Sequence, residues 1–177
     1  MSVMTGRGDS GETDLLYGRR VAKASPRVEA LGAIDELNTG LGLVRCHSGQ
    51  ELVKRIDWIQ GRLVGLMGEL AVLPADWTRY QEDGMPIVSQ DDVLALENWG
   101  RDIEKAGVRF EGWARPGASG SLAAAFLDQA RTICRRAERR VLELGKEASQ
   151  IEVRLFLNRL SDFLWLSARW EETDRGA

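Results

Sequence analysis

Three arginines recur at intervals of four residues, at Arg131, Arg135 and Arg139. Side chains at this spacing are neighbours on one face of a helix, so their like charges repel by roughly 0.2–0.5 kcal/mol per pair. The row therefore contributes nothing to helix stability. A guanidinium group binds phosphate through two nitrogen atoms and keeps its charge under all ordinary conditions. Together with Glu138, the row is suited to a polyanion such as a triphosphate.

A second interpretation of the row is a solvent-exposed face that forms salt bridges to other helices, because charge runs on helices usually lie at the surface. The apolar residues beside the row alternate spacings of four and three, which predicts a bundle helix with one buried seam. This helix should end near Gly145. Its apolar residues are Ala123, Leu127, Ala130, Cys134, Ala137, Val141 and Leu144.

Histidine and cysteine, two common catalytic residue types, are scarce in this chain. His47 is the only histidine, which excludes a zinc site with two histidines and argues against Ser-His or Cys-His nucleophilic catalysis. Cys46 and Cys134 are the only cysteines, and Cys134 lies on the apolar seam of the arginine helix. We therefore assign neither a disulfide nor a metal site to them.

The first 25 residues contain several glycines and other turn-forming residues but no helical period, which predicts a loop. Such a loop can direct backbone N–H groups at phosphates. Gly6 and Gly11 have the spacing of a Walker A loop, but Glu12 and Thr13 stand where that motif requires Lys and Ser or Thr. We therefore reject a P-loop. A disordered tail is the alternative interpretation.

Ser25 and Pro26 predict the start of the first helix, since a hydroxyl cap followed by proline is a preferred opening. Asp35 adjoins the apolar stripe of this helix. A carboxylate there is costly to bury unless it is paired. Asp35 therefore either pairs with a cation from another element or another subunit, or lies exposed at the edge of the stripe.

Three further helices complete the expected set. Apolar periodicity predicts one over residues 52–70, a capping-box variant at Ser89 starts another that reaches residue 103, and a capping box at Ser149 starts the last. Asn158 interrupts this last, strongly apolar helix, so either a ligand or a neighbouring helix must satisfy its amide. In the loop over 107–120, the aromatic residues either cover an apolar ligand or pack into the core.

The composition indicates one globular domain. The chain has 177 residues, of which 44% are hydrophobic and 29% charged, and no apolar run approaches the ~20 residues that span a bilayer. A net charge of −3 argues against a nucleic-acid surface. The first residues lack a secretory signal, so a cytoplasmic location is expected.

No strand alternation is visible along the chain. We therefore expect an all-α architecture: a five-helix bundle with ferritin-like up-and-down packing over residues 25–172. A glycine-rich arm over 1–24 precedes this bundle, and a short tail over 173–177 follows it.

Segments at three places in the chain together resemble the PduO-type ATP:cob(I)alamin adenosyltransferases, also called corrinoid adenosyltransferases. The resemblance implies a homotrimer of five-helix bundles with active sites between subunits. It also implies transfer of the 5′-deoxyadenosyl group of ATP to cob(I)alamin, which gives adenosylcobalamin and triphosphate. The matching segments, in the family's order and spacing, are residues 5–11 with 20–23, 28–38, and 131–140 with 156–162.

In this reaction the reduced cobalt is itself the nucleophile, so the lack of a catalytic histidine is no objection. The protein and Mg²⁺ position the reactants and neutralise the leaving triphosphate. The resemblance implies that Arg135 meets the terminal phosphate, and that Mg²⁺ is held mainly by ATP phosphates near Glu138 and Asn158. The implied ATP-binding residues are Thr5, Gly6, Arg7, Gly8, Thr13, Asp14, Lys23, Arg135, Arg136, Glu138, Arg139 and Asn158.

The resemblance assigns catalytic roles to Arg135, Arg131 and Asp35, with Arg131 and Asp35 paired across the subunit boundary. The last two residues would also contact the corrinoid. An aromatic residue that helps to hold cobalamin, usually Phe, stands in the family three residues before Pro-Gly. Trp113 occupies that position here, and Phe110 is a second candidate.

The arm departs from the family pattern. The family usually has Thr-Lys/Arg-Thr-Gly-Asp, whereas this chain has Thr-Gly-Arg-Gly-Asp over residues 5–9, a change that bears on ATP affinity. The alternative function is therefore a non-catalytic paralogue that binds cobalamin or ATP and delivers or senses adenosylcobalamin. For the transferase and for the paralogue alike, the expected partner is an adenosylcobalamin-dependent acceptor enzyme. A purely structural helical trimer is a third hypothesis.

Overall fold

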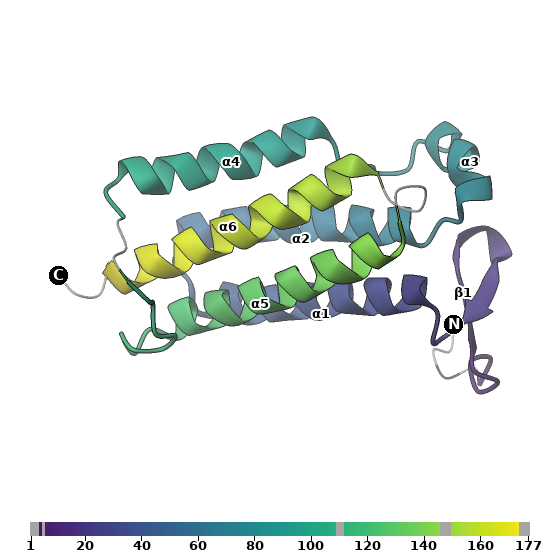
Figure 1. Ribbon diagram of the computed structural model, residues 1–177, viewed down its shortest axis with the longest axis horizontal. Helices are drawn as coiled ribbons and strands as arrows, with labels where there is room; N and C mark the ends of the chain where they lie inside the picture. The colour runs from purple at the N-terminus through teal and green to yellow at the C-terminus, as the bar shows by residue number, and fades with distance from the viewer. Residues whose placement is uncertain (1–3, 5, 109–111, 146–149, 174–177) are drawn as a thin grey trace.

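The computed structural model describes residues 4, 6–108, 112–145 and 150–173. Within these ranges five helices of 16 or more residues run side by side along the long axis of the molecule (Figure 1). The helical prediction is thus confirmed. These helices are α1 (Pro26–His47), α2 (Gln50–Leu70), α4 (Gln90–Lys105), α5 (Leu122–Glu143) and α6 (Ile151–Thr173).

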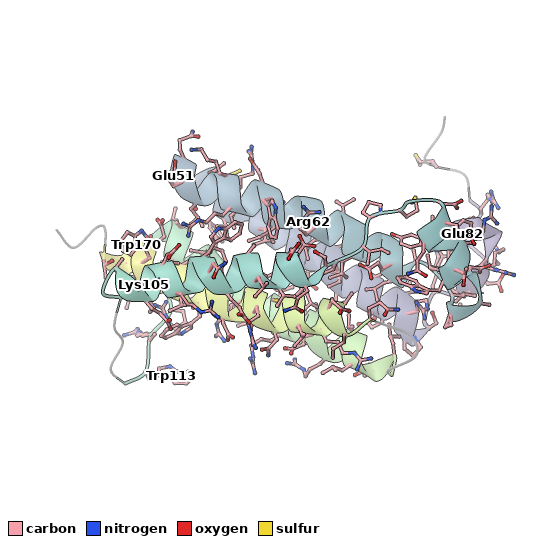
Figure 2. The ribbon with its side chains drawn as sticks, turned by 90° about the horizontal axis from the view of Figure 1, so that it is seen from above. Glu51, Arg62, Glu82, Lys105, Trp113 and Trp170 are labelled. Carbon is pink, nitrogen blue, oxygen red and sulfur yellow. The ribbon has the colours of Figure 1, made fainter. Side chains whose placement is uncertain are left out.

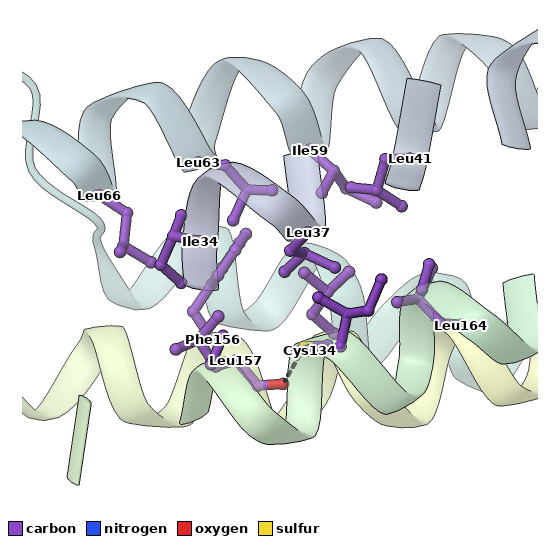
Figure 3. Packing of buried hydrophobic residues seen from close by; sticks show 14 of the residues in the cluster. Ile34, Leu37, Leu41, Ile59, Leu63, Leu66, Cys134, Phe156, Leu157 and Leu164 are labelled. Atoms are coloured by element: carbon purple, nitrogen blue, oxygen red, sulfur yellow. Dashed lines mark hydrogen bonds between the residues drawn. The ribbon is translucent and has the colours of Figure 1, made fainter. Parts of the chain in front are cut away.

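The helices pack in the order α2, α1, α5, α6, α4, because α1 contacts α2 and α5 while α6 contacts α5 and α4. Side chains close the remaining side: the rings of Trp58 on α2 and Trp99 on α4 lie 5.0 Å apart. The apolar seams meet inside, where Leu37, Leu63 and Phe156 are fully buried (Figure 3). The seam predicted for the arginine helix is confirmed as core from Ala123 to Val141, whereas Leu144 is only partly buried.

The helix boundaries follow the capping signals in the sequence. The Ser25 hydroxyl accepts a hydrogen bond from the Val28 amide at 3.4 Å, and Ser89 and Asp92 form both bonds of a capping box. Gly145, at φ +76°, follows α5 as a left-handed residue. The predicted cap Ser149 lies outside the described residues, and α6 begins at Ile151.

Short elements in the arm and in the connection after α2 correct the expectation that the chain outside the long helices is irregular. Strands β1 (Glu12–Asp14) and β2 (Arg20–Ala22) form an antiparallel pair around the 3₁₀ turn η1 (Leu16–Gly18). The expectation of no strand was wrong because three residues are too few to show alternation. The connection after α2 holds the 3₁₀ turn η2 (Pro74–Asp76) and helix α3 (Trp77–Glu82).

Polar contacts fix the arm to this connection. The Arg19 guanidinium donates two hydrogen bonds of 2.7 Å to the Asp76 carboxylate, and the Tyr17 hydroxyl donates one of 2.8 Å to Asp83. The Arg19 guanidinium also keeps the pKa of the Asp76 carboxyl below its usual value. The described part of the arm is thus anchored at one end of the bundle. No helix in the described ranges is long and apolar enough to cross a membrane.

Candidate functional site

The arginine row of α5 is only partly engaged by the protein. The Arg131 side chain is 29% exposed, and its Nε lies 3.8 Å from the Asp128 carboxylate. Arg135 and Arg139 are exposed. Neither of them has an ion-pair or hydrogen-bond partner in the described part of the chain. Among the residues that the structure describes, these two guanidinium groups, one turn apart on the surface of α5, therefore have no compensating partner.

The other two arginines of this helix are used in packing. Arg136 forms an ion pair with Glu36 of α1, and Arg140 lies 3.4 Å from Glu29 of the same helix. The interpretation of the arginines as a salt-bridged face therefore holds for Arg136 and Arg140. It does not hold for Arg135 and Arg139. Arg136, predicted to bind ATP, is engaged with α1 in this structure.

Polar side chains of α6 and α4 meet beside the row. The Asn158 amide donates a hydrogen bond to Glu138 at 3.2 Å and accepts one from Arg159 at 2.6 Å. Arg159 also donates to Glu97 at 2.9 Å, and this hydrogen bond keeps the pKa of Glu97 below its usual value. A neighbouring helix therefore satisfies the amide that interrupts the apolar face of α6, and it brings together two residues predicted near the nucleotide.

The arm is a preformed turn rather than an open tail in its described part. Gly6 and Gly11 adopt φ values of +66° and +83°, which favour glycine. The Lys23 amide donates to the Gly11 carbonyl at 2.8 Å, which closes the turn. The Lys23 ammonium lies over Gly8, where a Cβ atom would be 2.7 Å from Nζ. Thr5, the first predicted ATP-binding residue, lies outside the described residues.

The other arm residues that were predicted to bind ATP have different surroundings. Asp14 is held between Arg7 at 3.3 Å and Arg20 at 3.2 Å, so its charge is compensated within the arm. Thr13 on β1 is half-buried. Asp14 therefore meets cations here, and Arg7 points toward β1 rather than away from the arm.

Trp113 stands beside a cavity at the other end of the bundle. Its side chain is 92% exposed, and the cavity of about 290 Å³ also has Arg131 in its wall. Asp35 on α1 is exposed and has no ion pair in the described part of the chain. Phe110 lies outside the described residues. The cavity is lined by Gly112, Trp113, Ala114, Pro116, Asp128, Arg131, Trp165 and Arg169.

Sequence reasoning missed Asp128, Trp165 and Arg169 as members of this cavity. A signal for each existed, since Asp128 stands three residues before Arg131 and Trp165 four before Arg169, both neighbouring positions on a helix. The Arg169 guanidinium lies 5.6 Å from the centre of the Trp165 ring. What the sequence could not show is that the two pairs meet.

One chain does not bring all predicted residues together. Trp113 lies near Lys105 and Trp170 at one end of the bundle, whereas Glu82 of α3, the element that anchors the arm, lies at the other end (Figure 2). A larger cavity of about 420 Å³, between Leu52, Ile103 and Trp170, contains none of the predicted residues. The candidate site is thus divided between the arm end and the Trp113 end.

Comparisons with known proteins match nearly the whole chain to one family. The chain matches the family model described as cobalamin adenosyltransferase over residues 3–171. It is 38% identical over 182 residues to corrinoid adenosyltransferase PduO of Salmonella typhimurium, covering 98% of this chain and 51% of that protein. It is 36% identical to a cobalamin adenosyltransferase of Cupriavidus metallidurans, covering 94% of this chain and 86% of the relative. The chain thus spans about half the length of the PduO relative.

A solved structure shares the fold. It is a single-residue variant of a PduO-type ATP:corrinoid adenosyltransferase from Lactobacillus reuteri complexed with cobalamin and ATP, with a TM-score of 0.87 and 30% sequence identity. The superposition covers 97% of this chain and 91% of that one. Because the family match extends from the arm through α5 and into α6, the chain belongs to the cobalamin adenosyltransferase family.

Proposed function

We propose that this protein transfers the 5′-deoxyadenosyl group of ATP to the cobalt of cob(I)alamin, which yields adenosylcobalamin and triphosphate. The observation that carries this proposal is the pair Arg135 and Arg139, exposed and without partners in the described part of the chain. A bound polyanion would relieve their mutual repulsion. The names of the relatives, and the cobalamin and ATP in the Lactobacillus complex, support the substrate pair.

The chemistry requires little of the side chains beyond position and charge. The electron pair of Co(I) forms the new bond to C5′ of the ribose, and the C5′–O bond breaks with its electrons leaving on triphosphate. Arg135 and Arg139 would neutralise this leaving group, with Lys23 from the arm. Holding cobalt in line with C5′ should supply the rest of the rate enhancement, because the two reactants then need not meet by diffusion.

Mg²⁺ would join this site with its nucleotide. Magnesium binds through one or two carboxylates together with substrate phosphates, and Glu138, beside Asn158, supplies one carboxylate next to the row. No group of three or more His, Cys, Asp or Glu residues in the described ranges could hold a metal ion. The donor set therefore fits an ion that is bound mainly by triphosphate.

The complete site would form between subunits of a homotrimer. The described part of the arm and Trp113 lie at opposite ends of the bundle (Figure 2), which supports a site to which two chains contribute. In this assembly the exposed Asp35 of one subunit would pair with Arg131 of its neighbour. Trp113 would face the corrinoid in place of the usual Phe.

An assay with ATP, Mg²⁺ and chemically reduced cobalamin tests the proposal. The corrinoid spectrum should change to that of adenosylcobalamin, and triphosphate should accumulate in equal amount. No adenosylcobalamin above the enzyme-free control would overturn it.

A second candidate function is a non-catalytic carrier or sensor of adenosylcobalamin. The altered arm favours it, because Gly6 and Arg7 change the nucleotide-binding pattern over residues 5–9. Titration calorimetry separates the two functions. Tight cobalamin binding without ATP binding or turnover would indicate the carrier, whereas binding of both ligands with turnover would indicate the transferase.

A further inference from the structure

A buried ion pair connects α5 to α6 beneath Trp113. Nη2 of Arg169 donates a hydrogen bond of 2.6 Å to Oδ2 of Asp128, and their side chains are only 4% and 5% exposed. The two residues are 41 positions apart in the chain and line the same cavity of about 290 Å³. This contact is therefore made by the packing of two helices at the floor of the candidate corrinoid site.

The pair belongs to a chain of alternating charges. Arg169 lies 2.7 Å from Glu172 on one side, and the other oxygen of Asp128 lies 3.8 Å from Nε of Arg131. Nε of Arg131 is buried and has no hydrogen-bond partner in the described part of the chain. Asp128 is thus the group that attracts the inner part of the Arg131 side chain toward the cavity floor.

Stability alone does not account for this arrangement. Two charges must be desolvated to form a buried ion pair, and apolar residues of similar volume often stabilise a protein as well or better. In the ion pair between α2 and α4 the arginine reaches solvent: Arg62 is 43% exposed and its Nε lies 3.0 Å from the Asp92 carboxylate. The pair of Asp128 and Arg169 differs from the Arg62 pair because Asp128 also lies next to Arg131, which is predicted to act in the reaction.

We propose that Asp128 and Arg169 are positioning residues, which hold the guanidinium group of Arg131 at the floor of the Trp113 cavity. Arg169 orients the Asp128 carboxylate from α6, and this carboxylate orients Arg131 on α5. The inference rests on the proposed function, in which Arg131 and Trp113 contact the corrinoid. Its expected signature is a raised KM for cobalamin with little change in KM for ATP.

The decisive variant replaces both charges at once, Asp128→Leu with Arg169→Met. Apolar replacement of the whole pair should keep the melting temperature close to that of the wild type. Arg169→Met alone leaves the buried Asp128 carboxylate without its hydrogen-bonded guanidinium and should lower the melting temperature. Arg62→Gln is the matched control, since it removes an interhelical arginine pair away from the cavity.

For the double variant we expect a KM for cobalamin raised about tenfold or more, because Arg131 has lost its orienting partner. Arg169→Lys, which keeps the charge but loses the planar fork, should show a smaller increase. Arg62→Gln should keep the wild-type KM. A double variant with wild-type stability and wild-type KM for cobalamin would overturn the inference.

A crystal structure of the double variant tests the positioning without any assay. The Arg131 guanidinium should move from the cavity floor, whereas an unchanged position would overturn the inference. If the wild type itself makes no adenosylcobalamin, the proposed function fails, and this structure still decides whether the pair holds Arg131.

Discussion

Arg135 stands out at the residue scale because it combines exposure, a fixed charge and a like-charged neighbour at Arg139. If it neutralises the leaving triphosphate, Arg135→Ala should lower kcat by about a hundredfold or more. Steady-state rates of adenosylcobalamin formation would measure this. Arg140→Ala is the control on the same helix, since Arg140 is engaged with Glu29 and Glu143 and should be nearly silent. Equal rates for the two variants would remove Arg135 from the mechanism.

Gly8 offers a second test at this scale. A Cβ atom there would lie 2.7 Å from Nζ of Lys23, and the end of this flexible side chain can move at little cost to the fold. Gly8→Ala should therefore raise KM for ATP and leave the melting temperature almost unchanged.

The matched control is Gly61→Ala, on the exposed side of α2 with no atom within 4 Å of the new Cβ. It should raise stability by up to about 1 kcal/mol, because alanine is the better helix former, and leave KM for ATP unchanged. An unaltered KM in Gly8→Ala would show that the place of Lys23 over Gly8 has no part in nucleotide binding.

The residues themselves show what a sequence can and cannot predict about the site. The row of Arg131, Arg135 and Arg139 was predictable because spacing alone places the residues on one face of a helix. The partner of Asn158 was left open, and the structure identifies it as Glu138. The pair of Asp128 and Arg169 was not predictable, since it depends on how far α5 and α6 are shifted along each other.

At the scale of elements, the C-terminal end of α2 carries a buried acid. Glu69 is 5% exposed, and its Oε1 accepts a hydrogen bond from the Val88 amide at 2.6 Å while Oε2 has no partner in the described part of the chain. Burial raises the pKa of this carboxyl to about 7. The folded protein therefore binds this proton more tightly than the unfolded chain.

A raised pKa of this kind makes stability depend on pH. The contribution is present below the ordinary glutamate pKa of 4.5 and is lost as the pH rises through about 7. The melting temperature of the wild type should fall by a few degrees between about pH 5 and pH 8. Glu69→Gln keeps an acceptor for Val88 without titrating, so its melting temperature should vary less. If the melting temperatures of the wild type and Glu69→Gln change with pH in parallel, Glu69 does not cause the pH dependence.

Elements whose ends carry a chemical signal were predictable from the sequence. Ser25 with Pro26, and Ser89 with Asp92, mark helix starts because their side chains bond free backbone groups of the first turn. Strands β1 and β2 were missed because each has three residues, too few to show alternation. Helix α3 has six residues, which is too short to show an apolar period.

At the scale of the whole molecule, the division of the candidate site makes a quantitative prediction. Lys23→Ala at the arm end and Trp113→Ala at the loop end should each reduce activity. If every active site uses the arm of one chain and the loop of another, hetero-oligomers of the two variants regain some intact sites. Random mixing in equal amounts should restore roughly a quarter of the sites. Activity after co-refolding measures this, and a mixture no better than its separate parts would show that each chain supplies its own site.

The number of chains in the assembly is the property that the sequence of one chain specifies least directly. Exposure of Asp35 and Trp113 leaves surfaces open to a partner, but one subunit does not define which partner covers them. The shape of the bundle, by contrast, follows from the seams of the five long helices, which are local patterns. The long helices were therefore predictable from the chain itself, whereas the proposed trimer depends on family resemblance.

The exposed arginines of α5 and the buried ion pair between α5 and α6 should respond differently to ionic strength. Dissolved ions screen exposed charges over about 8 Å at physiological salt, and they screen buried pairs much less. Arg135 and Arg139 are exposed, whereas Asp128 and Arg169 are buried. Added sodium chloride should therefore weaken nucleotide binding progressively while it leaves cobalamin binding almost constant. A salt titration would thus distinguish the two ends of the molecule without a single substitution.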